Sequence, residues 1–284
     1  MNFPESIRNE IENELNVSIR EITPVYGGDI NNAAKITFQN DTQFFIKWNM
    51  KSPPNMFESE AKGLKLLSSE NTHLVIPEVH LAHPHFLILD WIEEVNGNPD
   101  AFAFGKELAK LHKKTDDRFG LSFDNYIGRL PQPNNRHSNW FDFFAIERIE
   151  PQIKMGVESG KLARTVLRQV EGLYKNLGRI FPVEKPALLH GDLWSGNYMF
   201  TKNDKSSIYD PAVYYGHREM DIAMTQLFGG FPPDFYHGYE DEFPLEPGFE
   251  TRKPLYNLYP ILVHANLFGG TYCRQAEEII GRFA

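Results

Sequence analysis

The chain has 284 residues and a mass of 32.8 kDa, a length that favours two domains or lobes with a sizeable core. Hydrophobic residues make up 41% and charged residues 24%, which excludes a disordered, collagen-like or coiled-coil protein. The formal net charge of −9 argues against a general nucleic-acid binder, which needs a basic surface. The single cysteine, Cys273, excludes an intramolecular disulfide and is typical of a reducing compartment.

Signals for membrane insertion or export are absent from the sequence. The first 16 residues are charged and lack the apolar segment of a secretory signal. No apolar run approaches the roughly 18 residues that a membrane-spanning helix needs. We therefore expect a cytoplasmic protein that binds neither membrane nor nucleic acid. No feature of the sequence sets the oligomeric state.

The first third of the chain is rich in predicted strands. Apolar residues recur every four positions near the N-terminus and again from Met56, which indicates helices, whereas alternation with period two indicates strands. The glycine- and asparagine-rich run at 27–32 is typical of a turn between strands. The predicted elements are a helix over 5–16, strands over 34–38, 43–48, 79–81 and 86–92, and a helix from 56 to about 68.

The Asn-Gly-Asn-Pro run at 96–99 marks a strong break, and the pattern changes there from strands to helices. We therefore divide the chain into a lobe of residues 1–93 and a lobe of residues 94–284. The second lobe is predicted to contain helices around 104–111, 141–153, 162–177, 221–228, 256–269 and 274–283, with loops over 118–137 and 231–254. The predicted class is α+β: an antiparallel sheet with one main helix, followed by a mostly helical lobe.

The residues that carry chemistry lie in the second lobe. Asp192 and Asn197 stand five residues apart on one predicted loop, the spacing of the catalytic loop of protein kinases. In kinases the Asp accepts the proton of the attacking hydroxyl and the Asn binds a magnesium ion. Asp210, placed on a following strand, occurs where kinases hold their second metal-binding Asp. The three residues together predict a catalytic base, Asp192, and a Mg²⁺ site formed by Asn197 and Asp210.

The first lobe supplies the remaining kinase parts. Lys47 ends a strand after three apolar residues, where a kinase lysine would contact the α- and β-phosphates of ATP. Glu60 lies on the following predicted helix beside its apolar stripe and could pair with Lys47, although Glu58 is a competitor. The turn with Gly27, Gly28 and Asp29 joins two strands, as a phosphate-covering loop does, although it is not a G-x-G-x-x-G motif.

Several longer strings resemble the fructosamine kinase, or ketosamine-3-kinase, family, whose fold is that of protein kinases and aminoglycoside phosphotransferases. The resemblance covers the chain from about residue 5 onward, and HGDLWSGN and DPAVYYGHRE are its most specific parts. The strings are GGDIN (27–31), MFESE (56–60), GRLPQPNN (128–135), WFDFF (140–144), HGDLWSGN (190–197), YDPAVYYGHREMD (209–221) and LFGGF (227–231).

The resemblance implies a kinase that uses ATP and Mg²⁺ to phosphorylate the sugar 3-hydroxyl of a ketosamine or other glycated amine. Phosphorylation there makes the adduct unstable and frees the amine. The resemblance also implies roles for further residues. Asp90, Trp91 and Ile92 would form the hinge that contacts adenine, Trp194, His217 and Glu219 would contact the substrate, and Asp221 would brace the catalytic loop.

Three other functions remain open at this point. A kinase of the same fold could use an aminoglycoside, choline or a hydroxy amino acid as its acceptor. The acidic residues 239–242 could attract a cationic acceptor. The chain could also be an inactive nucleotide-binding protein, although all five kinase residues are present. A metal-dependent hydrolase built on His190, Asp192 and Asp210 would need more His or carboxylate metal ligands close in sequence than the chain has.

Overall fold

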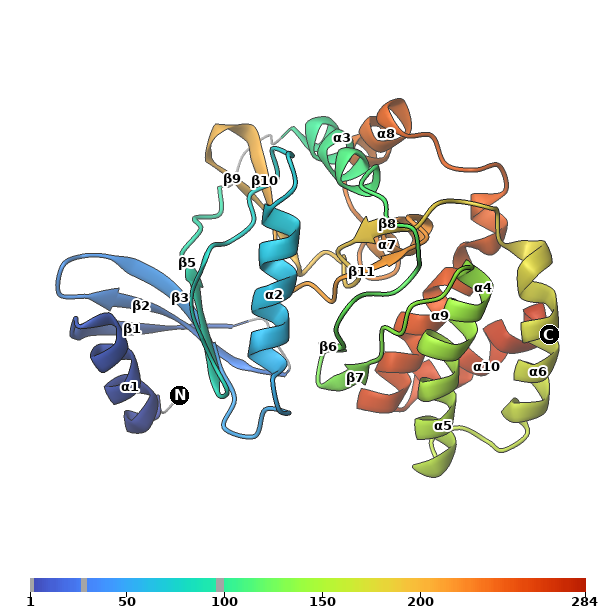
Figure 1. Ribbon diagram of the computed structural model, residues 1–284, viewed down its shortest axis with the longest axis horizontal. Helices are drawn as coiled ribbons and strands as arrows, with labels where there is room; N and C mark the ends of the chain where they lie inside the picture. The colour runs from blue at the N-terminus through green and yellow to red at the C-terminus, as the bar shows by residue number, and fades with distance from the viewer. Residues whose placement is uncertain (1–2, 27–29, 96–99) are drawn as a thin grey trace.

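A computed structural model describes residues 3–26, 30–95 and 100–284, which form two lobes (Figure 1). The first lobe contains one antiparallel sheet with the strand order β1-β2-β3-β5-β4 and two helices. Its elements are α1 (Glu5–Leu15), β1 (Ile19–Val25), β2 (Asn32–Phe38), β3 (Gln43–Trp48), α2 (Met56–Ser68), β4 (Val79–His83) and β5 (Phe86–Asp90). This lobe confirms the predicted antiparallel sheet.

The two helices of the first lobe cover opposite faces of the sheet, because side chains alternate between faces along each strand. On β5, Phe86 and Ile88 pack in the core beneath α1, whereas Leu87 and Leu89 pack against α2. Lys47 on β3 pairs with Leu87 in the sheet register, so its side chain lies on the α2 face. Because side chains alternate between the two faces along β3, Lys47 points toward α2, the helix that carries Glu60.

The second lobe is mostly helical, with short two-stranded sheets, and its helices pack around α9 and one continuous core. Its elements are α3 (Ala101–His112), β6 (Asn125–Ile127), β7 (Leu130–Gln132), α4 (Trp140–Phe143), the π-helical turn η1 (Phe144–Ile149), α5 (Glu150–Glu158), α6 (Val166–Ile180), β8 (Ala187–Leu189), β9 (Tyr198–Thr201), the 3₁₀ turn η2 (Lys202–Asp204), β10 (Lys205–Ile208), β11 (Tyr214–Gly216), α7 (Glu219–Thr225), α8 (Pro233–Glu242), α9 (Phe249–Phe268) and α10 (Thr271–Phe283). The predicted α+β class is confirmed.

Three local predictions need correction, and a fourth gains its bounds. The strand expected before the turn at 27–32 was given no bounds, because β1 is an edge strand that carries Pro24 and alternates weakly. The segment 231–254, expected to be a loop, contains α8 and the start of α9. The segment 118–137 contains the hairpin β6–β7. Asp210 follows β10 rather than lying within a strand.

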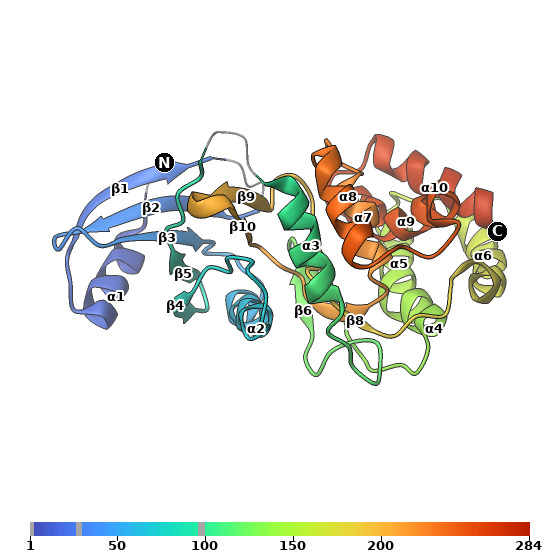
Figure 2. The same cartoon turned by 90° about the horizontal axis from the view of Figure 1, so that it is seen from above.

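The hairpin β9–β10 belongs to the second half of the sequence but lies beside the first lobe in both views (Figures 1 and 2). Backbone hydrogen bonds to the first lobe fix it there: Val75 N donates to Ser206 O at 2.9 Å, and Ile208 N donates to Val75 O at 3.2 Å. The lobes therefore meet along the segment that leads to Asp210.

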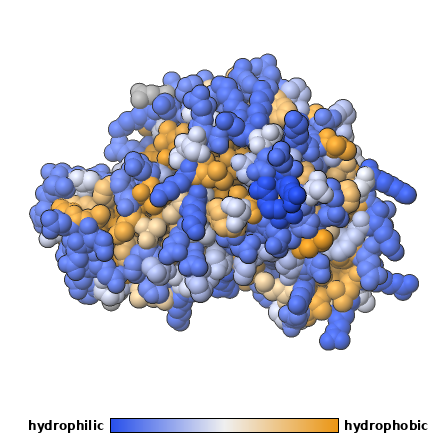
Figure 3. Space-filling view, viewed as in Figure 1, coloured by the Kyte–Doolittle hydropathy of each residue, from blue (hydrophilic) through white to orange (hydrophobic). Residues whose placement is uncertain are grey.

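The molecular surface in Figure 3 is mostly hydrophilic, with apolar side chains gathered in patches, one of them between the two lobes. Among the helices that the structure describes, none combines the length and the apolar character needed to cross a membrane.

Helices α3 and α8 cross at two glycines. A Cβ at Gly105 would overlap the carbonyl oxygen of Phe235, and a Cβ at Gly238 would overlap the carbonyl oxygen of Phe102. Each glycine thus lets the backbone of one helix touch the backbone of the other. Because both clashes are with backbone atoms, no side-chain movement can relieve them.

We expect Gly105→Ala to lower the free energy of unfolding by roughly 3 kcal/mol, because overpacking against backbone forces the helices apart. Gly178→Ala is the matched control, since the position is an exposed site on α6 where the nearest atom lies 4.0 Å from a new Cβ. It should raise stability by about 0.5–1 kcal/mol through helix propensity. Urea denaturation measures both values, and equal effects of the two substitutions would contradict the crossing described here.

Candidate active site

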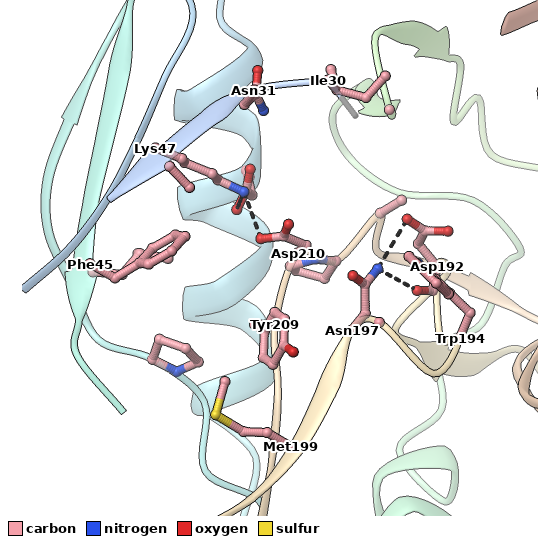
Figure 4. Close-up of a pocket in the computed structure, with 18 of the residues that line it drawn as sticks. Ile30, Asn31, Phe45, Lys47, Asp192, Trp194, Asn197, Met199, Tyr209 and Asp210 are labelled. Atoms are coloured by element: carbon pink, nitrogen blue, oxygen red, sulfur yellow. Dashed lines mark hydrogen bonds and ion pairs between the residues drawn. The ribbon is translucent and has the colours of Figure 1, made fainter. Parts of the chain in front are cut away.

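One large cleft of about 1220 Å³ lies between the lobes. Its walls bring together residues from β2 and β3, the segment after β5, the loop 190–197, the segment around Asp210, and α9. Figure 4 shows Lys47 on one side of this cleft, Asp192 and Asn197 on the other, and Asp210 between them. The fold thus gathers the five residues that the sequence suggested were kinase parts.

Lys47 sits at the centre of an ion-pair cluster. Its ammonium group pairs with Glu60 of α2 and donates a 2.7 Å hydrogen bond to Asp210 Oδ1. The structure therefore pairs Lys47 with Glu60 and not with Glu58. Burial disfavours the charged form of Lys47, but the two carboxylates outweigh that effect and raise its pKa. The lysine therefore stays cationic at any physiological pH.

Asp192 and Asn197 form the opposite wall of the cleft. Asn197 donates through Nδ2 to the Asp192 carbonyl oxygen at 2.8 Å and to Asp192 Oδ2 at 3.2 Å. Because the amide nitrogen faces Asp192, the amide oxygen of Asn197 faces the Asp210 side, as Figure 4 shows. Burial, with a further contribution from the Asp210 carboxylate, raises the pKa of Asp192 to about 7. A carboxyl group with this pKa suits a general base near neutral pH.

Asp210 has a left-handed backbone conformation, with φ of +56°. This region is disfavoured for residues other than glycine, although Asp tolerates it better than most. Tyr209 N, one residue before it, donates to Asn197 O at 3.1 Å, and Ala212 N, two residues after it, donates to His190 O at 2.9 Å. These bonds tie the Asp210 segment to the loop 190–197, which is the predicted catalytic loop.

The side chains present fit a magnesium ion bound together with nucleotide. Asn197 and Asp210 offer amide and carboxylate oxygens, which are the hard ligands that Mg²⁺ prefers, and Mg²⁺ commonly takes one or two carboxylates plus substrate phosphates. Within the described ranges, no cluster of three or more His, Cys, Asp or Glu side chains could hold a metal by itself. The donor set therefore matches a metal completed by phosphate oxygens.

Asp221 braces the catalytic loop, and this prediction is confirmed. Its carboxylate accepts the backbone N–H groups of His190 at 2.7 Å and Gly191 at 2.9 Å. His112 Nε2 lies 3.2 Å from the same carboxylate. His190 itself donates from Nε2 to Tyr209 O at 2.9 Å, so its ring packs the loop and does not face a metal.

The glycine turn and the hinge stay predictions. Gly27, Gly28 and Asp29 lie outside the described residues, although Ile30 and Asn31 beside them line the cleft. Asp90, Trp91 and Ile92 also line it. The Asp90 carboxylate is engaged by β4 and the residue before it: it contacts His80 Nε2 at 2.7 Å and accepts the backbone N–H of Glu78 at 3.1 Å. Contact with adenine would therefore come from backbone groups of the hinge.

The far end of the cleft is aromatic and apolar. Trp194 lines it, and its ring lies against the backbone at Gly196, where any side chain would overlap it. Phe228 of the LFGGF string lies beside Trp194, with the two ring centroids 6.2 Å apart, and the C-terminal part of α9 and the start of α10 complete the wall. These residues are Phe228, Pro260, Val263, His264, Leu267, Phe268 and Tyr272. The role of Trp194 in substrate contact stays a prediction, and the α9 and α10 residues carried no sequence signal beyond helical spacing.

The predicted substrate contacts of His217 and Glu219 are corrected, because both side chains are buried away from the cleft. His217 stacks on Trp140 at 4.6 Å between ring centroids and hydrogen-bonds with Tyr256. Glu219 forms a buried, two-fold ion pair with Arg252. The chain turns inward after β11, so proximity in sequence to Asp210 does not bring these residues to the site.

The acidic stretch 239–242 does not face the cleft either. Tyr239 is buried, Asp241 pairs with Lys106, and Glu242 pairs with Lys113. These residues form the outer side of the α3–α8 pair. The stretch therefore offers no attraction for a cationic acceptor in the cleft.

We expect Asp221→Asn to lower the free energy of unfolding by about 2 kcal/mol, because the neutral amide loses the charge and turns its NH₂ toward one loop N–H. Asp234→Asn is the control, since Asp234 is exposed on α8. Urea denaturation of both variants measures the difference. A loss no larger than that of the control would contradict the bracing role.

The buried His217 predicts a pH dependence of stability. Burial, together with Arg252 and Arg218, lowers the pKa of His217 well below its ordinary value. Below about pH 6.5 the unfolded chain therefore binds a proton that the folded chain does not, so stability present above that pH is lost as the pH falls. Wild type should lose up to about 1.4 kcal/mol per pH unit more than His217→Asn in this range. Equal slopes in denaturation curves from pH 7.5 to 5.5 would contradict this assignment.

Sequence comparisons match almost all of this chain to one family of known proteins. The fructosamine kinase family model matches residues 4–284. The probable ketoamine kinase of Vibrio parahaemolyticus is 40% identical over 93% of this chain and 92% of its own length. The chloroplastic protein-ribulosamine 3-kinase of Arabidopsis thaliana is 37% identical over 92% of this chain and 82% of its own.

Solved structures agree in fold. A crystal structure of a candidate fructosamine-3-kinase from Thermobifida fusca has a TM-score of 0.87 and 30% identity, covering 98% of both chains. A thermostable mutant of the aminoglycoside phosphotransferase APH(4)-Ia has a TM-score of 0.61 at 14% identity over 97% of both chains, which shows a shared fold alone. Because the fructosamine kinase family model matches residues 4–284, this chain belongs to the fructosamine kinase family.

Proposed function

We propose that this protein transfers the γ-phosphoryl group of ATP to the 3-hydroxyl of the sugar in a ketosamine. The observation that carries this proposal is the arrangement in one cleft of the Lys47–Glu60 pair, Asp210, and the Asp192–Asn197 pair. Phosphoryl transfer needs positioning and charge neutralisation rather than a covalent protein intermediate, and these residues supply both.

Each residue has a part in the proposed reaction. Lys47 contacts the phosphates of ATP, and Glu60 holds its ammonium group in place. Asp192 orients the sugar hydroxyl and accepts its proton as the oxygen bonds to the γ-phosphorus and ADP leaves. Asn197 and Asp210 would hold the magnesium ion, which neutralises charge on the β- and γ-phosphate oxygens when bound.

The acceptor follows from the relatives and from the wall of the cleft. Relatives that match nearly the whole chain are named ketoamine kinases and protein-ribulosamine 3-kinases, and more distant relatives of the fold were crystallised with AMP-PNP or ATP. The aromatic wall around Trp194 suits a sugar ring and its amine substituent. Phosphate on O3 would destabilise the adduct and release the free amine.

We expect an ATP-consumption assay with Mg²⁺ to show turnover on a fructosamine or a ribulosamine and none on plain sugars or an aminoglycoside. Asp192→Ala should lower kcat by at least about 10²–10³ while nucleotide affinity stays within about threefold, because the base contacts the hydroxyl and not the phosphates.

Two results would contradict the proposal. Turnover on an aminoglycoside but on no ketosamine would replace the acceptor. Loss of nucleotide binding in Asp192→Ala, measured by titration with AMP-PNP, would make Asp192 a structural residue and remove it from the chemistry.

A further inference from the structure

Two buried side-chain amides donate hydrogen bonds to the backbone of the segment that follows Asp210. Gln132 donates through Nε2 to the carbonyl oxygen of Ala212 at 3.0 Å, and Asn125 donates through Nδ2 to the carbonyl oxygen of Val213 at 2.9 Å. Both amides come from the hairpin β6–β7, and both are almost fully buried. Two successive carbonyls, two and three residues after Asp210, thus each receive a side-chain donor.

A second layer of residues supports the two amides from behind. The Tyr259 hydroxyl donates to Gln132 Oε1 at 2.8 Å. Asn125 Oδ1 accepts Gln132 Nε2 at 2.8 Å and Asn134 Nδ2 at 3.0 Å. Arg148 donates to Asn134 Oδ1 at 2.6 Å. The strings GRLPQPNN and WFDFF, with the π-helical turn η1 that follows, therefore converge on one buried polar network.

Arg148 determines which end of each amide in this network donates a hydrogen bond and which end accepts one. Its guanidinium group is fully buried, and its charge centre lies 4.0 Å from the centroid of the Tyr214 ring and 4.5 Å from that of Phe143. No carboxylate of the described chain forms an ion pair with it. Because Arg can only donate, Asn134 must present its oxygen to Arg148 and its nitrogen to Asn125. Asn125 is then obliged to turn its own nitrogen toward Val213 O.

Asp210 needs such support. Its left-handed backbone is a disfavoured conformation that persists only where the surroundings hold it. The loop 190–197 also approaches closely, since a Cβ at Gly191 would overlap the carbonyl oxygen of Ala212. A shift of Ala212 or Val213 would therefore move both Asp210 and the catalytic loop.

We propose that Gln132 and Asn125, supported by Tyr259 and Arg148, are positioning residues that hold the Asp210 carboxylate where a metal bound with nucleotide requires it. This inference rests on the proposed function, in which Asp210 is a metal ligand. Partners that orient a metal ligand without touching the metal typically change metal affinity or activity by 10–100-fold when removed. The network therefore acts on the metal site through the backbone of residues 210–213.

The test compares two tyrosines three residues apart on α9. Tyr259→Phe removes only the hydroxyl that holds Gln132. Tyr256→Phe is the matched control, because it removes a buried hydroxyl that bonds His217, outside the cleft. We expect the dissociation constant of Mn²⁺ in the presence of AMP-PNP, measured by electron paramagnetic resonance, to rise about tenfold in Tyr259→Phe and to change less than twofold in Tyr256→Phe.

In the ketosamine assay, Tyr259→Phe should lower kcat about tenfold and leave the KM for the ketosamine within twofold. Gln132→Met removes the side-chain amide that donates to Ala212 O and to Asn125 Oδ1. It should weaken Mn²⁺ binding at least as much as Tyr259→Phe does. If Gln132→Met fails to fold, Tyr259→Phe alone decides. Wild-type Mn²⁺ affinity in Tyr259→Phe, with a loss of stability equal to that of Tyr256→Phe, would make the network structural and overturn the proposal. Because Mn²⁺ binding needs no acceptor, a failure of the ketosamine assay alone would count against the proposed acceptor and not against this network.

Discussion

A buried lysine that reaches carboxylates from two lobes is the interaction on which the rest of the site depends. Lys47 stands on the sheet, Glu60 on α2, and Asp210 follows β10, so one ammonium group joins three elements. A buried cation is costly unless it is paired and hydrogen-bonded. The requirement to satisfy Lys47 therefore fixes the position of α2 against the sheet and of the Asp210 segment across the cleft.

Three sets of hydrogen bonds in the second lobe hold Asp210 in position for that ion pair. Asp221 holds the backbone of the catalytic loop, and the catalytic loop holds the residues on both sides of Asp210. Behind them, the amides of β6–β7 hold the next two carbonyls. Each set uses a buried polar group whose partners are fully specified, and such networks favour one arrangement over others. A strained backbone at Asp210 is stable in this setting because every neighbouring group is fixed.

Much of the site could be predicted from the sequence, because its parts depend on local spacing. Asp192 and Asn197 share one loop, and the run of three apolar residues before Lys47 already placed it at the end of a strand. The choice of Glu60 over Glu58 followed from the apolar stripe of α2, which turns only one of the two toward the sheet. These features need little knowledge of tertiary structure.

The errors arose where tertiary packing decides. His217 and Glu219 follow Asp210 closely in sequence, but the inward turn after β11 buries them, and their partners Tyr256 and Arg252 come from a distant helix. Helix α8 was expected to be a loop because its segment is rich in prolines, aromatics and acids, and the role of Gly238 is visible only in the crossing with α3. The amides Asn125 and Gln132 looked like loop residues, since their partners lie about 80 residues away in sequence.

The most direct test of the account is the site of phosphate on the product of a fructosamine incubated with ATP, Mg²⁺ and the protein. Phosphorus–proton correlation by nuclear magnetic resonance identifies the esterified oxygen. The account predicts one new phosphate ester, coupled to the proton on C3 of the sugar. A phosphate on another oxygen, or hydrolysis of ATP with no ester formed, would contradict it.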